Sequence, residues 1–103
     1  MAWQVPNEFV VRLERQKRIA RTLPPGTVQG ICTRYHRERW DYLDEQYDRA
    51  KDDSEAGWGR VDDECRQILN ASMERERREI EENVDGADDN PMLDAYYRLL
   101  KAF

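Results

Sequence analysis

Apolar side chains recur every three or four residues between Val28 and Val84, which is the spacing of amphipathic helices. The first half of this stretch holds Val28, Ile31, Cys32, Tyr35, Tyr42, Leu43, Tyr47 and Ala50, and the second half holds Val61, Cys65, Ile68, Leu69, Met73, Ile80 and Val84. Gly57-Trp58-Gly59 divides the halves, and each glycine weakens a helix by about 1 kcal/mol relative to alanine. We therefore predict two long helices joined by a turn at these glycines in an antiparallel hairpin. One continuous bent helix is the alternative.

The first long helix would extend from Thr27, a typical N-cap residue, to about Glu55. The apolar pattern outside the hairpin predicts two shorter helices. One covers residues 6–23 and ends at Pro24-Pro25-Gly26. The other follows an acidic loop at 85–89, begins with the cap and proline pair Asn90-Pro91, and is apolar on most sides as far as Phe103. Residues 1–103 thus predict a single all-α domain, with the shorter helices packed near the open end of the hairpin.

The hairpin also predicts which residues face each other. Arg39 and Glu76 lie 18 and 19 residues from a turn centred on Gly57, and each falls within the apolar face of its helix. We predict that they form a partly buried ion pair, which specifies register more than it adds stability. The same register separates Cys32 and Cys65 by roughly 25 Å, at ~1.5 Å per residue. A disulfide needs Cα atoms within about 7 Å, so we expect two free thiols.

Composition limits how much core the chain can build. Apolar residues make up 39% of the chain and charged residues 38%, whereas globular domains have roughly 45–50% and about 25%. Either a narrow apolar seam or an assembly with other chains must supply the burial. Charge is also uneven, because residues 1–40 carry a net +5 and residues 41–103 a net −10. An acidic stripe lies along the first long helix, and we interpret it as a solvated face or a surface for a basic partner; it consists of Asp41, Asp44, Glu45, Asp48, Asp52 and Glu55.

Catalytic chemistry finds little support in the sequence. Cys32 and His36 are helical neighbours and could act as nucleophile and base, but no orienting group accompanies them, and packing is the simpler interpretation. One histidine and two distant cysteines do not match a zinc site, and the acidic loop lacks the ligand pattern of an EF-hand. We therefore expect no enzyme activity, no cofactor, no metal and no small-molecule substrate.

The basic N-terminal third has two interpretations. Its arginines could contact phosphates of a nucleic acid, or could face an acidic protein surface, including the acidic part of this chain. The candidate phosphate-binding residues are Arg12, Arg15, Arg18 and Arg21. No helix-turn-helix or zinc module accompanies them, so nucleic-acid binding stays the alternative function.

The apolar C-terminal helix is the strongest functional signal. It could close the open end of the hairpin or insert into another subunit, and the candidate partner-binding residues are Trp3, Met92, Tyr96, Tyr97, Leu100 and Phe103. We therefore predict a non-enzymatic interaction protein, such as an assembly subunit, adaptor or inhibitor of viral or mobile-element origin, with a protein partner or a second copy of itself. No leader or membrane-spanning run is evident, which favours a cytoplasmic or virion setting.

Overall fold

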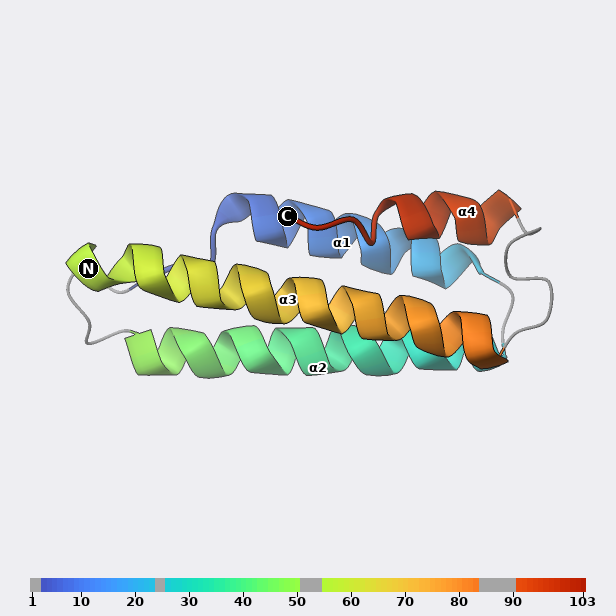
Figure 1. Ribbon diagram of the computed structural model, residues 1–103, viewed down its shortest axis with the longest axis horizontal. Coiled ribbons are helices and arrows are strands. Elements are labelled where there is room, and N and C mark those ends of the chain that lie inside the picture. Colours follow the sequence, from blue (N-terminus) through green and yellow to red (C-terminus); the bar gives the residue numbers. More distant parts are fainter. Residues whose placement is uncertain (1–2, 24–25, 51–54, 84–90) are drawn as a thin grey trace.

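The computed structural model describes residues 3–23, 26–50, 55–83 and 91–103. These contain four helices: α1 (Asn7–Thr22), α2 (Thr27–Ala50), α3 (Glu55–Asn83) and α4 (Pro91–Arg98). The helices run alternately up and down along one axis of a rod with extents of 48 × 20 × 19 Å (Figure 1). The all-α architecture is confirmed. The predicted loop at 85–89, the Asn90 cap and the two prolines after Leu23 lie outside the described residues.

α2 and α3 form the predicted hairpin and pack more closely than any other pair of helices. The predicted turn at Gly57-Trp58-Gly59 is wrong, because α3 already begins at Glu55. The alternative of one continuous bent helix is also wrong, since α2 ends at Ala50 and α3 lies antiparallel beside it (Figure 1). Trp58 packs against the core from within the helix. This contact offsets the helix-weakening effect of the two glycines.

The predicted alignment of α2 with α3 is correct even though the turn is not where we expected it. Arg39 and Glu76 face each other, as expected for a hairpin centred near Gly57, although α2 ends at Ala50 and α3 begins at Glu55. The first turns of α3 therefore extend beyond the end of α2, as Figure 1 shows. The N-terminal segment lies beside this extension, where the Trp3 indole donates a hydrogen bond of 2.8 Å to Asp62 and is 1% exposed.

Other helix boundaries differ from the prediction in smaller ways. Thr27 is the first residue of α2 and not its cap, and Gly26 precedes it with φ +139°, a conformation that favours glycine. α4 ends at Arg98 instead of continuing to Phe103, and the last residues run back along α1 (Figure 1). There the Phe103 ring packs on Phe9 with 4.6 Å between centroids.

The core has two parts. The apolar end, where α2 meets α3 near their connection, consists of Trp3, Phe9, Leu13, Leu43, Ala50, Val61, Cys65 and Leu69. The α4 end consists of Ala20, Leu23, Ile31, Cys32, Tyr35, Met73, Ile80, Leu93, Tyr96 and Leu100. Most predicted apolar positions are therefore buried. Tyr47 and Ile68 are exceptions, because they are 41% and 46% exposed.

Candidate functional site

A buried polar network lies between α2, α3 and α4. Arg39 Nη2 lies 2.5 Å from Glu76 Oε1, and their side chains are 1% and 0% exposed. Arg39 Nε also donates to Ser72 Oγ at 2.9 Å. The predicted ion pair is present, and it is fully buried where we expected partial burial. Its position between the two long helices ties their register to one arrangement.

Tyr96 of α4 extends this network to His36. The Tyr96 hydroxyl donates its hydrogen to Glu76 Oε2. The oxygen of the Tyr96 hydroxyl also lies 3.1 Å from His36 Nε2. Because the hydroxyl hydrogen is used on the carboxylate, the oxygen can only accept from His36, so Nε2 carries the imidazole proton. Nδ1 of His36 is buried and has no hydrogen-bond partner among the residues that the structure describes. A neutral His36 therefore keeps a bare acceptor lone pair.

Burial governs the protonation states here. It lowers the pKa of His36 to about 4, with Arg39 and Lys17 adding repulsion of the charged form. Burial also raises the pKa of the Glu76 carboxyl, which the Arg39 guanidinium and the Tyr96 hydroxyl oppose. The network thus combines a neutral imidazole with a buried carboxylate that depends on Arg39 for its charge.

The candidate Cys32–His36 dyad is not assembled as a nucleophile and base. Burial, followed by the Glu76 charge, raises the pKa of the Cys32 thiol to about 12, so the thiolate is disfavoured at neutral pH. His36 directs Nε2 to Tyr96. Both cysteines are buried and free, as predicted. These contacts support packing as the role of Cys32.

The candidate partner-binding residues lie mostly inside the protein. Trp3, Tyr96 and Leu100 are 1%, 0% and 9% exposed, so α4 closes the bundle, which was one of its two expected roles. Tyr97 and Phe103 are half-buried, with Arg77 over the Tyr97 ring at 5.5 Å and Arg12 over the Phe103 ring at 4.3 Å. The side chain of Met92 lies outside the described residues. In this arrangement the three buried side chains offer no surface to a partner.

The candidate phosphate-binding arginines divide into two groups. Arg12 is engaged within the chain, because its Nη1 donates to the Lys101 carbonyl at 2.7 Å. Arg15, Arg18 and Arg21 are exposed on α1. Three cations therefore remain accessible on one helix.

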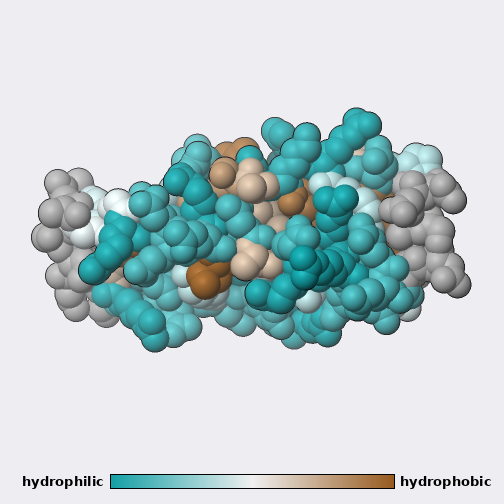
Figure 2. Space-filling view, viewed as in Figure 1, coloured by the Kyte–Doolittle hydropathy of each residue, from teal (hydrophilic) through white to brown (hydrophobic). Residues whose placement is uncertain are grey.

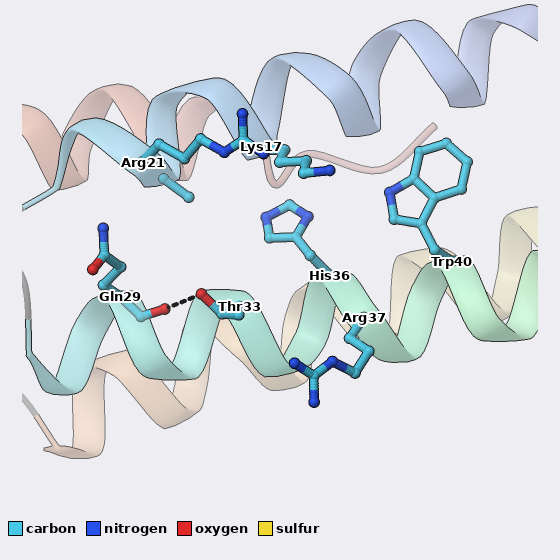
Figure 3. A pocket seen from close by; sticks show the side chains of 8 residues that line it. Lys17, Arg21, Gln29, Thr33, His36, Arg37 and Trp40 are labelled. Carbon is cyan, nitrogen blue, oxygen red and sulfur yellow. Dashed lines mark hydrogen bonds between the residues drawn. The ribbon is translucent and has the colours of Figure 1, made fainter.

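A groove between α1 and α2 brings Arg21 and His36 together with residues that the sequence did not single out. It encloses about 280 Å³ and is lined by Lys17, Ala20, Arg21, Gln29, Thr33, His36, Arg37 and Trp40. In Figure 3, His36 projects from α2 towards Lys17, and Trp40 lies at one end of the groove while Gln29 lies at the other. The Arg37 guanidinium points away from α1 in the same view. Lys17 and Arg21 are thus the cations that α1 contributes to the side of the groove opposite His36.

Gln16 is a further polar residue whose role the sequence did not reveal. It interrupts the apolar face of α1, is 0% exposed, and its Nε2 donates to the Leu99 carbonyl at 2.5 Å. An interrupted apolar face was the available signal for both Gln16 and His36. That signal identifies a buried polar residue without identifying its partner.

Comparison with protein-family models, curated proteins and solved structures gives no match. Within the described ranges, no cluster of three or more His, Cys, Asp or Glu side chains could hold a metal ion. None of the helices in the same part of the chain has both the length and the hydropathy needed to cross a bilayer.

Proposed function

We propose that the protein is a non-enzymatic protein–protein interaction protein that binds its partner through its charged faces. The observation that carries this proposal is the separation of charge along the rod. Arg15, Arg18 and Arg21 are exposed in the second half of α1, and the acidic stripe exposes Asp41, Asp44, Glu45 and Asp48 in the second half of α2. The two helices are antiparallel, so these halves extend towards opposite ends of the rod (Figure 1). Such separated basic and acidic regions steer association with a charge-complementary surface.

The surface is better suited to a polar contact than to an apolar one. On the face shown in Figure 2, hydrophilic residues cover most of the surface and apolar residues form small patches. Tyr96 and Leu100, which we expected to anchor a partner, are buried in the core. This supports docking through the arginines of α1 in place of α4.

A charge-reversal experiment tests the proposal. Affinity capture from the native source would compare the natural protein with a variant in which Arg15, Arg18 and Arg21 are changed to Glu. A matched control changes Arg75, Arg77 and Arg78 of α3, which are also exposed, to Glu. A protein partner retained by the control and lost by the α1 variant would support the proposal. Equal retention by all three proteins would contradict it.

Nucleic-acid binding is a second candidate, favoured by the basic groove. Lys17, Arg21 and Arg37 line the groove, and Arg34 lies at the neighbouring part of α2. Fluorescence anisotropy with mixed-sequence DNA or RNA would measure it over a series of salt concentrations. If the chain binds phosphates, log affinity falls with log salt by about 0.7–0.9 per neutralised phosphate, and the α1 variant loses part of this slope. Absence of binding at 50 mM salt would exclude this candidate.

A further inference from the structure

The groove between α1 and α2 has the composition of an anion site. Three of its eight lining residues, Lys17, Arg21 and Arg37, carry positive charge, and none carries a carboxylate. Its volume of about 280 Å³ is near the lower end of small-molecule sites. Basic side chains alone would hold any anion, so the specificity depends on the other polar residues of the lining. These are Gln29, Thr33 and His36, and of the three only His36 is buried.

His36 supplies a second and independent observation. It is 6% exposed, it lines the groove, and its Nδ1 has no partner among the described residues. A buried polar atom without a partner costs about 1–3 kcal/mol, so a group that satisfies Nδ1 is favoured. Because Nε2 carries the proton, Nδ1 needs a donor. Nδ1 is covered, and the long Lys17 and Arg21 side chains are the flexible ones that can shift to admit a ligand oxygen.

We propose that this groove binds a small oxyanion that carries its own acidic hydrogen, for which hydrogen phosphate is the simplest example. Lys17 and Arg21 hold the charged oxygens, and the P–OH group donates to Nδ1 of His36. A sulfate dianion or an internal phosphodiester of a nucleic acid has charge but no hydrogen to donate. The site therefore separates hydrogen phosphate from these anions, and it does not depend on the function proposed above.

The groups around His36 support the neutral form that this contact requires. Lys17 from α1 and Arg39 on α2 disfavour the imidazolium, and Tyr96 from α4, itself bonded to Glu76 of α3, occupies Nε2. Two cations thus oppose protonation, and the carboxylate is separated from the ring by a hydroxyl. His36 acts as an acceptor at neutral pH.

His36 is the single histidine of the chain, so its imidazole C–H signals in a proton NMR spectrum report on the site without assignment of the rest. The experiment titrates sodium phosphate and sodium sulfate into the full chain at pH 7.5 and constant ionic strength. We expect phosphate to shift the His36 signals saturably and sulfate to bind about tenfold more weakly, because it lacks the hydrogen bond to Nδ1. Equal shifts with the two anions, or none with phosphate, would overturn the proposal.

Two variants that each remove one positive charge distinguish binding in the groove from attraction to the overall charge of the protein. Arg21→Gln removes a groove cation, and Arg18→Gln removes an exposed cation of α1 outside the groove. We expect at least fivefold weaker phosphate binding for Arg21→Gln and less than a twofold change for Arg18→Gln. Circular dichroism would show that both variants fold. Equal weakening by both would overturn the site, and so would a His36 signal that becomes protonated on binding, since His36 would then donate.

Discussion

The two ends of the core are built in different ways. At the apolar end, Leu43, Val61 and Leu69 pack with other apolar side chains, and none of the charged residues in the described part of the chain is buried among them. At the α4 end, the core surrounds the network of Arg39, Glu76, Tyr96, Ser72 and His36. Apolar contacts are non-directional, whereas the network forms in one register only. The apolar end therefore contributes stability, and the α4 end fixes how the helices are aligned.

The largest effect is expected from Glu76→Gln. The change leaves the Arg39 guanidinium buried without a counter-charge, and breaking a buried pair in this way costs about 3–5 kcal/mol. Urea unfolding followed by circular dichroism would measure the loss. The double variant Arg39→Met with Glu76→Leu should recover most of it, because the charge is removed together with its partner. A loss below about 1 kcal/mol for Glu76→Gln would show that the pair is solvated.

Leu69→Ala probes the apolar end and should cost about 2–5 kcal/mol, since Leu69 is 0% exposed and leaves a cavity. The same denaturation measurement applies. Unlike Glu76→Gln, this variant should not be rescued by a change at Arg39. Rescue would mean that the two ends are coupled more tightly than their separate packing indicates.

His36 should make stability depend on pH. Its pKa is about 4 in the folded chain and about 6.5 in the unfolded chain. The unfolded state therefore takes up a proton first, and stability falls as pH drops from about 6.5 to about 4. Between pH 7 and 5.5 the expected loss is about 1 kcal/mol, measured by urea unfolding at each pH. His36→Gln should lack this part of the slope, and an unchanged slope would assign it to other groups.

The smallest effect is expected at Gly57, and it is favourable. Gly57 lies within α3, and a Cβ there would have no neighbour within 4 Å. Gly57→Ala should therefore raise stability by about 0.5–1 kcal/mol in thermal or urea unfolding. Gly26→Ala is the matched control, because φ of +139° makes alanine unfavourable there. If Gly57→Ala destabilised the chain, the helical start of α3 would be in question.

The sequence was sufficient to predict the helices and the pairing of Arg39 with Glu76. It was not sufficient to predict the groove between α1 and α2. Apolar periodicity placed most buried residues, and counting along the hairpin placed Arg39 opposite Glu76. The turn was misplaced because the sequence shows only that glycines weaken a helix locally. It does not show that Trp58 between them contacts the core, which is a tertiary contact. The hydroxyl that pairs with His36 comes from Tyr96 of α4, and Lys17, which lines the groove with His36, comes from α1; both are distant from His36 in sequence. Spacing within α2 holds no information about them.

The three tryptophan side chains lie in different environments, so their intrinsic fluorescence can report on different parts of the protein. Trp3 is sealed in the apolar end, Trp40 borders the groove, and Trp58 is half-buried at the start of α3. In variants that keep one tryptophan and carry phenylalanine at the other two positions, the tryptophan fluorescence would come from a single known site. Fluorescence of Trp40 would then follow events at the groove while Trp3 followed melting of the opposite end.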